Sequence, residues 1–174
     1  MTTLPPRRLS LIAAMTENRV IGVAGGLPWD LPDEMQQFRA YTLGHPVIMG
    51  RANWDAEAKP LPHRRNIVLT TRRDWSPPPE FVGAVEVCHS LDEALERVGD
   101  SDPEPFIIGG GKVYELALPI VDRMVLTTIH TTLEGDTYFP EFDERDWAVT
   151  DARHHLADAR HDYAFTVRTL DRAR

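Results

Sequence analysis

The chain has 174 residues, of which 42% are hydrophobic and 26% charged, a composition typical of a globular domain rather than a disordered chain. Its 19 Lys and Arg against 27 Asp and Glu give a formal net charge of −8, which disfavours nucleic acid as a partner. Cys88 is the single cysteine, so an intrachain disulfide is excluded and a reducing compartment is expected.

The first elements of the chain are expected to be a flexible tail over residues 1–8 and a strand over residues 9–15. Arg7 and Arg8 ahead of an apolar run faintly suggest a signal peptide. The run is short, however, and no small-x-small cleavage pattern follows it, so a buried strand is preferred. No run approaches the ~18 apolar residues that a membrane span needs. We therefore expect a cytoplasmic protein that does not enter a membrane.

Beyond this strand, short apolar runs alternate with helical patterns. Further strands are expected over residues 46–49, 66–70, 85–88, 106–108 and 123–129, and helices over residues 31–42, 90–98 and 112–118. Ser90 and Glu93 form a capping box at the start of the second helix. Leu156 and the alternating run 163–169 suggest closing antiparallel strands. The sequence predicts a single α/β domain over residues 9–170, with a mixed, mostly parallel central sheet flanked by helices.

The helix expected over residues 31–42 places a carboxylate on its apolar face. Asp30 is in position to cap this helix. With Leu31 set at 0°, Glu34 falls at about 300° and Phe38 at about 340°, from the 100° that separates successive residues. Asp33 falls at about 200°, on the opposite side, and is expected to face water. Glu34 therefore shares a face with the apolar residues.

A carboxylate on an apolar face costs desolvation free energy unless a partner compensates for it. A cationic or multi-donor ligand would supply that partner. The alternative is a Glu at the edge of the apolar stripe whose carboxylate reaches solvent, and the helix alone favours this alternative. The preceding segment favours a site, because Gly22, Gly25 and Gly26 predict a flexible loop over residues 18–27, as expected of a lid.

Three strand ends carry residues suited to phosphate. Gly109, Gly110, Gly111 and Lys112 join a strand to a helix, where glycines allow close approach and backbone N–H groups face outward. The pattern is neither GxGxxG nor a P-loop, and a plain tight turn is an equally good interpretation. Residues 49–54 and 69–73 offer further turns, each of which by itself is better explained as solvated surface. Together, the three turns favour a phosphorylated cofactor at the carboxyl edge of the sheet.

These motifs, taken in order, resemble the bacterial dihydrofolate reductase family from about residue 9 to residue 170. The matching blocks are Ile12-Ala-Ala-Met15, Arg19-Val-Ile-Gly22, Leu27-Pro-Trp-Asp-Leu-Pro32, Val47-Ile-Met-Gly-Arg51 with Trp54, Pro60-Leu-Pro62 with Arg64-Arg-Asn66, Ile108-Gly-Gly-Gly111 with Val113-Tyr114-Glu115, and Glu134-Gly-Asp136-Thr with Phe139-Pro140. Each block alone is weakly specific, whereas the ordered set is very specific.

The resemblance implies an oxidoreductase that transfers a hydride from NADPH to 7,8-dihydrofolate and forms tetrahydrofolate. It makes Glu34 the acid that holds the pterin amino group and ring nitrogen and favours the protonated ring. Thr127 matches the hydroxyl that supports this acid, and Trp29 matches the residue that holds a nearby water. Arg64 would pair with the glutamate tail of the substrate. The pocket would be lined by Ile12, Met35, Phe38, Leu61 and Ile108.

The same resemblance assigns the cofactor residues. Asp136 matches a loop residue that latches the segment near Gly22 and Val23. The family has a cis peptide in its glycine pair, here Gly109 and Gly110. Arg51, Thr71 and Arg72 would take the 2′-phosphate, which favours NADPH over NADH. The full expected set is Ala14, Ile21, Gly22, Gly25, Gly26, Leu27, Gly50, Arg51, Ala52, Asn53, Thr70, Thr71, Arg72, Gly109, Gly110, Gly111, Lys112, Val113 and Tyr114.

Five positions depart from the family pattern. Ala52 and Asn53 replace larger or hydroxyl-bearing residues, and Lys112 stands where Arg is frequent. Glu57 lies where an apolar residue is common, and Leu27 replaces a common Met. These departures bear on cofactor affinity and inhibitor profile rather than on the reaction.

Two rival functions are a pyrimidine reductase of riboflavin synthesis on the same fold and a nucleotide-binding regulator without catalysis. The first would keep the cofactor glycines without pairing Glu34 with Thr127 and Arg64, and the second has no use for the full polar set. The seven histidines predict no metal site, since adjacent His154 and His155 cannot face one ion, and surface positions are expected. We expect a monomer whose partners are small molecules.

Overall fold

The computed structural model describes residues 8–100, 102 and 104–173, so most of the expected tail over residues 1–8 lies outside the described residues. The strands are β1 Ser10–Thr16, β2 Val20–Gly22, β3 Val47–Gly50, β4 Asn66–Leu69, β5 Val85–Cys88, β6 Phe106–Gly109, β7 Arg123–Ile129, β8 Thr137–Tyr138, β9 Trp147–His155 and β10 Phe165–Arg172. The α-helices are α1 Pro32–Thr42, α2 Arg51–Glu57, α3 Leu91–Val98 and α4 Gly111–Ala117, with short 3₁₀ turns at Pro79–Phe81 and Glu144–Asp146.

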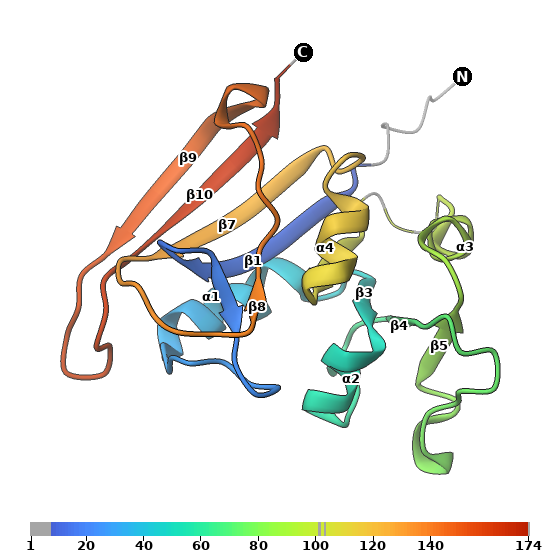
Figure 1. Ribbon diagram of the computed structural model, residues 1–174. Coiled ribbons are helices and arrows are strands. Elements are labelled where there is room, and N and C mark those ends of the chain that lie inside the picture. The colour runs from blue at the N-terminus through green and yellow to red at the C-terminus, as the bar shows by residue number, and fades with distance from the viewer. Residues whose placement is uncertain (1–7, 101, 103, 174) are drawn as a thin grey trace.

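Eight of these strands form one sheet in the order β5-β4-β3-β6-β1-β7-β10-β9 (Figure 1). All neighbouring pairs from β5 to β7 are parallel, whereas β10 runs antiparallel to both β7 and β9. The expected α/β domain with a mixed, mostly parallel sheet is therefore confirmed. β2 and β8 form a separate antiparallel ribbon.

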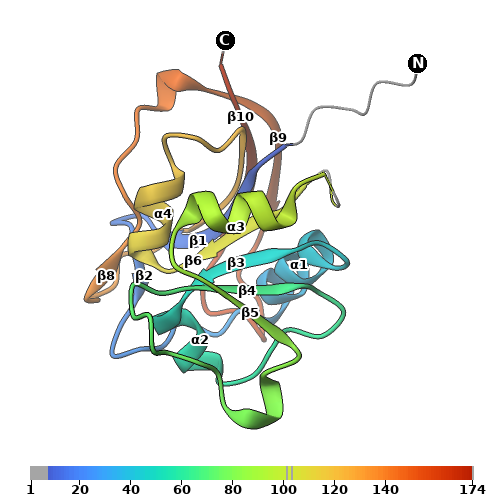
Figure 2. The ribbon, with the colours of Figure 1, turned by 90° about the vertical axis from the view of Figure 1, so that its right-hand side faces the viewer.

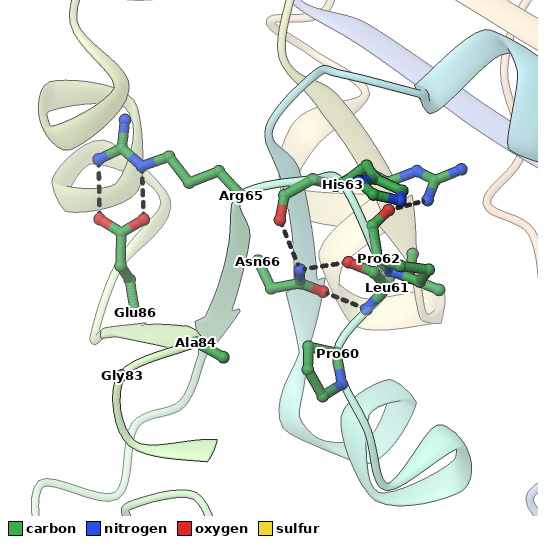
Figure 3. Close-up of a pocket in the computed structure, with 10 residues that line it drawn as sticks. Pro60, Leu61, Pro62, His63, Arg65, Asn66, Gly83, Ala84 and Glu86 are labelled. Atoms are coloured by element: carbon green, nitrogen blue, oxygen red, sulfur yellow. Dashed lines mark hydrogen bonds and ion pairs between the residues drawn. The ribbon is translucent and has the colours of Figure 1, made fainter.

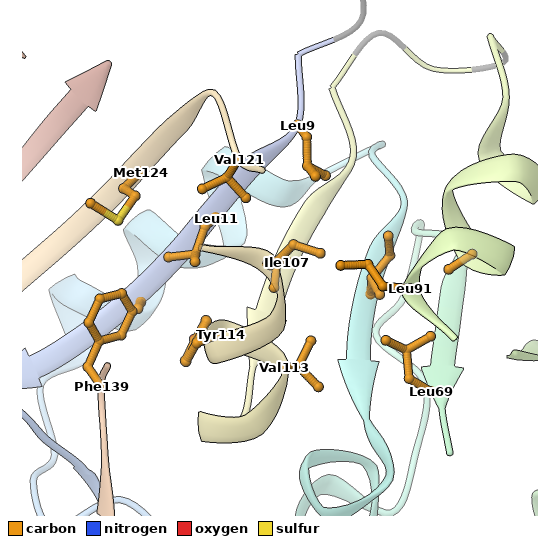
Figure 4. Packing of buried hydrophobic residues seen from close by; sticks show 14 of the residues in the cluster. Leu9, Leu11, Leu69, Leu91, Ile107, Val113, Tyr114, Val121, Met124 and Phe139 are labelled. Carbon is orange, nitrogen blue, oxygen red and sulfur yellow. The ribbon is translucent and has the colours of Figure 1, made fainter. Parts of the chain in front are cut away.

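The sheet buries both of its faces, as its uninterrupted apolar runs require. Along β1, Leu11 and Ala13 belong to a core cluster that also holds side chains of α3 and α4, and Figure 4 shows part of this cluster. Ile12 belongs to the second cluster, which contains Trp54 of α2 and packs against Phe38 of α1. Alternation along one strand thus divides the core between two layers of helices (Figure 2).

Most predicted elements lie within one residue of their observed bounds, and β7 matches its prediction at both ends. The turn after residue 49 opens a helix, α2. Ser90 caps α3 by accepting the Glu93 N–H at 3.0 Å, which confirms the predicted cap. Cys88 is buried and free. None of the helices in the described part of the chain is long and apolar enough to cross a membrane.

The predicted closing antiparallel strands are present as β9 and β10, although Leu156 itself lies outside them. β9 ends one residue earlier, and Leu156 is 72% exposed. β9 is the edge of the sheet, and most of its side chains face water after the buried Trp147. A strand without a buried face shows no alternation of apolar and polar residues, so the sequence pattern gave no sign of most of β9.

Candidate active site

A buried carboxylate is the central feature of the site. Glu34 is the third residue of α1 and is only 8% exposed. It lines a cavity of about 280 Å³, which is bordered by Leu27, Trp29, Asp30, Leu31, Pro32, Glu34, Met35 and Arg39. The prediction from helix periodicity that Glu34 faces inward is confirmed, and the alternative of a solvated carboxylate is excluded.

The surroundings of Glu34 hold its proton up to neutral pH. Burial raises the pKa of its carboxyl to about 7, whereas the hydroxyl of Thr127, hydrogen-bonded to the carboxylate, lowers that pKa in part. Thr127 is a buried residue of β7, so the partner is fixed by the sheet rather than by a loop. An acid whose pKa lies near the working pH can both take up and release a proton.

Two corrections concern the start of α1. Asp30 does not cap the helix: Leu31 occupies the cap position, with no side-chain cap, because the helix begins at Pro32. Asp33 lies on the side away from Glu34 and is partly exposed, but its carboxylate is paired rather than left to water alone. Its carboxylate oxygens lie 2.8 Å from His155 Nε2 and 2.5 Å from Arg160 Nη2. Helix periodicity gives the direction of a side chain but not what a distant segment places there.

Arg64 is held in one orientation by three acceptors. Its Nε donates to Thr42 Oγ1 at 2.9 Å, Nη1 to the Pro62 carbonyl at 2.5 Å and Nη2 to the Arg39 carbonyl at 2.9 Å. A guanidinium has five N–H groups, so one remains on each Nη atom. Two N–H groups of a guanidinium can donate to one carboxylate. Arg39, which also borders the Glu34 cavity, lies close to Arg64 and brings a second positive charge to this region.

Asn66, to which the sequence assigned no role, fixes the loop that carries Arg64. Its side-chain oxygen accepts the Leu61 N–H at 2.9 Å, and its amide donates to the carbonyls of Leu61 and Arg64 at 3.0 and 2.9 Å (Figure 3). Residues 60–66 border a second cavity of about 520 Å³ that extends to Gly83, Ala84 and Glu86. There, the side chains of Arg65 and Glu86 pair with each other, so the larger cavity offers less chemistry than the one at Glu34.

The predicted apolar wall of the pocket lies in one cluster. Ile12, Trp29 and Ile108 are buried members of the second core cluster, and Ala14, Phe38 and Leu61 pack against it. Met35 borders the cavity itself. Of the five predicted apolar substrate residues, four thus belong to this cluster or pack against it, and Met35 borders the cavity that holds Glu34.

The three strand ends predicted to hold a cofactor are neighbours. Gly50 of β3 pairs with Leu69 of β4, and Met49 pairs with Gly109 of β6. The Gly109-Gly110 peptide is cis, as predicted, and Gly109 has a φ of 110°, which favours glycine. A Cβ on Gly110 would meet nothing within 4 Å, so its backbone faces open space.

Around these strand ends, the other predicted cofactor residues form an exposed rim. Ala52, Thr71, Arg72 and Lys112 are exposed, and Arg51 and Asn53 are half-buried. Thr70 is buried, and its hydroxyl accepts the Arg72 N–H at 3.1 Å, which orders this turn. These residues share one edge of the sheet, where pairing between β3, β4 and β6 holds the three turns side by side.

The lid segment is more ordered than expected. The prediction of a flexible loop over residues 18–27 was wrong in part, because Val20–Gly22 forms β2 against β8. Asp136 Oδ2 accepts the Ala24 N–H at 2.9 Å, and the Asp136 N–H donates to the Gly22 carbonyl at 3.1 Å. The contact expected of a latch is thus present, and it joins Asp136 to this segment at Gly22 and Ala24. Cross-strand pairing was invisible in the sequence because both strands are very short.

Tyr114 joins the floor of the site. Its hydroxyl donates to carbonyls within two neighbouring strands, 2.8 Å from that of Ile12 in β1 and 2.9 Å from that of Ile108 in β6. Its ring packs against Phe139 with centroids 5.2 Å apart. Burial is the main cause that raises the pKa of the Tyr114 phenol, and the nearby Glu34 charge raises it further. The hydroxyl therefore keeps its proton and remains a hydrogen-bond donor.

Comparisons with known proteins agree over the whole described domain. A family model described as dihydrofolate reductase matches residues 8–172. The chain is 42% identical over 166 residues to the type 3 dihydrofolate reductase of Salmonella typhimurium, covering 95% of this chain and 99% of that protein. It is 39% identical over 157 residues to the dihydrofolate reductase of Bacillus subtilis, covering 90% of each.

A solved structure shares the fold. Dihydrofolate reductase from Enterococcus faecalis, complexed with NADP(H) and RAB-propyl, superposes with a TM-score of 0.88. It is 34% identical in sequence, and the match covers 96% of this chain and 97% of that one.

Proposed function

The chain belongs to the dihydrofolate reductase family, it catalyses the NADPH-dependent reduction of dihydrofolate, and we propose that Glu34 is the acid on which this reaction depends. The carrying observation is a buried carboxyl, with its pKa raised to about 7, in a cavity that borders Arg39. The comparisons do not favour the rival pyrimidine reductase of riboflavin synthesis.

The residues of this chain fit NADPH. Gly110 presents a bare backbone to open space that a side chain would fill, and Arg51 and Lys112 supply cations beside it. We propose that the turn at residues 109–113 holds the pyrophosphate, and that Arg51, Thr71 and Arg72 hold the 2′-phosphate. NADPH, when bound, supplies the hydride. Ala14 and Ile21 would contact its nicotinamide end. Ile21 lies next to the glycine turn, because its Cδ1 is 3.9 Å from where a Cβ on Gly111 would stand.

Glu34 would orient the pterin by accepting hydrogen bonds from its amino group and ring nitrogen. In its ionised form the carboxylate raises the proton affinity of the ring, because a negative charge in a poorly solvated cavity stabilises a nearby positive charge. Reduction of the N5=C6 bond places a hydride on carbon and a proton on nitrogen. Trp29, which borders the same cavity, would hold the water that delivers the proton.

Arg64 would hold the glutamate tail through its two remaining N–H groups. The chain thereby separates two tasks: Glu34 and Thr127 act on the ring, and Arg64 fixes the opposite end of the substrate. We further propose that the enzyme works as a monomer in the cytoplasm without nucleic acid. The net charge of −8 and the free, buried thiol of Cys88 support this.

The test is oxidation of NADPH, followed by its absorbance, with dihydrofolate as the second substrate. Glu34→Gln should lower turnover at pH 7 by about 100-fold or more, because general acid–base groups contribute that much, while NADPH affinity stays within about twofold. Glu96→Gln, an exposed change on α3, is the matched control and should be neutral. Full activity of Glu34→Gln would contradict the assignment, and lack of dihydrofolate-dependent oxidation by the unaltered enzyme would contradict the proposed reaction.

A further inference from the structure

The loop between β9 and β10, residues 156–164, reaches across to the first turn of α1. The N–H groups at a helix start have no partner within the helix. Leu31 provides no side-chain cap, and Pro32 has no N–H, so Asp33 carries the first N–H group of α1. That group donates to Nε2 of His161 at 3.0 Å. A histidine 128 positions along the chain therefore does the work of a helix cap.

The ring of His161 is set up for this task. Its side chain is fully buried, in contrast to the surface position expected from the sequence. Nδ1 lies 2.8 Å from Oδ1 of Asp158. A carboxylate only accepts hydrogen bonds, so Nδ1 must carry the proton and Nε2 must present its lone pair. The neutral tautomer that can accept the Asp33 N–H is thus imposed by Asp158.

The end of β9 and the same loop also hold the side chain of Asp33. His155, the last residue of β9, places Nε2 2.8 Å from Asp33 Oδ2, and Arg160 places Nη2 2.5 Å from Oδ1. The His155 ring is stacked on Phe165 with centroids 4.6 Å apart and planes 9° from parallel. Asp33 is therefore hydrogen-bonded through both its backbone N–H and its carboxylate.

A metal ion is a second possible use of this cluster, since one ligand atom each from Asp33, His155 and His161 lie within 4.8 Å of one another. Each atom already has a partner, however. The lone pair of His161 Nε2 accepts the Asp33 N–H. His155 Nδ1 donates to the Leu156 carbonyl at 2.7 Å, and its Nε2 faces a carboxylate to which Arg160 is also bound. The cluster is built as a hydrogen-bonded network.

Residue 33 directly precedes the catalytic acid, and this neighbourhood gives the network a consequence for the reaction. Successive residues of an α-helix point about 100° apart, so the backbone of the first turn sets the direction of the Glu34 side chain. If this turn loosened, Glu34 would no longer be held toward Thr127. We propose that His161 is a positioning residue, which fixes the first turn of α1 and thereby keeps the Glu34 carboxylate against Thr127. This inference rests on the proposed role of Glu34.

Two substitutions separate positioning from mere packing. The side-chain amide of His161→Gln places an acceptor near the position of Nε2. The shorter amide of His161→Asn reaches only the position of Nδ1. His161→Asn should lower kcat with dihydrofolate by about tenfold and leave KM for NADPH within about twofold. It should also change the pKa of Glu34, as followed by carbon NMR titration of the ligand-free protein. His161→Gln should restore both values nearly to those of the unaltered enzyme.

An unchanged kcat and Glu34 pKa in His161→Asn, or equal losses in both variants, would overturn the proposal. Should His161→Asn not fold, the half-exposed Asp158 provides the test. Asp158→Ala frees the ring to place its proton on Nε2, where it would oppose the Asp33 N–H. Asp158→Asn retains an acceptor. A loss confined to Asp158→Ala supports the proposal, and equal behaviour of this pair contradicts it.

The NMR readout also keeps this proposal separate from the proposed function. The pKa of Glu34 is measured without substrate, so it reports on the position of the carboxyl whether or not dihydrofolate is reduced. A pKa that differs between His161→Asn and His161→Gln would support positioning even if turnover failed. If Glu34 had the same pKa in His161→Asn and His161→Gln while the unaltered enzyme turned over normally, the positioning role of His161 would be rejected and the proposed function would stand.

Discussion

Glu34→Gln should stabilise the ligand-free protein, and increasingly so as the pH rises. Burial raises the pKa of the Glu34 carboxyl from about 4.5 to about 7. The folded chain therefore holds this proton over about 2.5 pH units in which the unfolded chain has released it. At 1.36 kcal/mol per unit, that difference corresponds to at most about 3.4 kcal/mol of lost stability.

The direction follows from the raised pKa. The stability associated with the carboxyl is fully present below about pH 4.5 and is lost as the pH rises through about 7. Gln does not titrate, and its carbonyl can still accept from Thr127. The free energy of unfolding of Glu34→Gln should exceed that of the unaltered protein by about 1 kcal/mol at pH 5 and about 3 kcal/mol at pH 8.

Urea unfolding followed by the fluorescence of the four tryptophans measures this difference. With an m-value of about 2 kcal/mol/M, the midpoint should rise by about 1.5 M at pH 8. Glu96→Gln, which alters an exposed carboxylate, should track the unaltered protein at both pH values. A difference for Glu34→Gln that is the same at pH 5 and pH 8 would refute the reasoning, because the buried carboxyl would then not be the titrating group.

Three further outcomes are expected. Arg64→Ala should raise KM for dihydrofolate by about 10- to 100-fold, the worth of a charge-assisted pair, with KM for NADPH nearly unchanged, and equal effects in steady-state kinetics would reject its role at the tail. His155→Gln should destabilise the protein most between about pH 4 and 6.5. The hydrogen bond between Asp33 and His155 is the main cause that lowers the pKa of Asp33 and raises the pKa of His155. The stability from this pair is therefore lost when the pH falls through the lowered pKa of Asp33, and also when it rises through the raised pKa of His155. A urea midpoint difference that does not vary with pH would contradict this. Ser90→Ala should cost about 1 kcal/mol of stability by removing the acceptor for the Glu93 N–H, with turnover unaffected, and an unchanged midpoint would show that the cap is dispensable.

The parallel part of the fold could be predicted from the sequence because its buried strands are continuous apolar runs. The runs that became β3, β4 and β7 are apolar on both faces, and helix periodicity sufficed to turn Glu34 inward. Ordered motifs then supplied the chemistry that periodicity could not. What remained hidden depends on distant partners or on very few residues.

Asp33 illustrates the limit. Its direction on the helix was predictable, but its partners on β9 and the following loop lie more than 120 positions away, and no local pattern marks them. Asn66 was missed for a related reason, since its three hydrogen bonds go to backbone groups of a loop without regular structure. Roles that a side chain plays toward the backbone leave little trace in a single sequence.

β9 has a further consequence, for the behaviour of many copies at high concentration. An exposed sheet edge is a template for pairing with another chain and hence for aggregation. Here, the longest edge carries Asp151 and Arg153, and Thr150 forms a bulge, because Thr169 pairs with Asp151 while Leu170 pairs with Val149. The opposite edge, β5, is only four residues long. Charge and irregularity at one edge and shortness at the other thus oppose edge-to-edge polymerisation of the sheet.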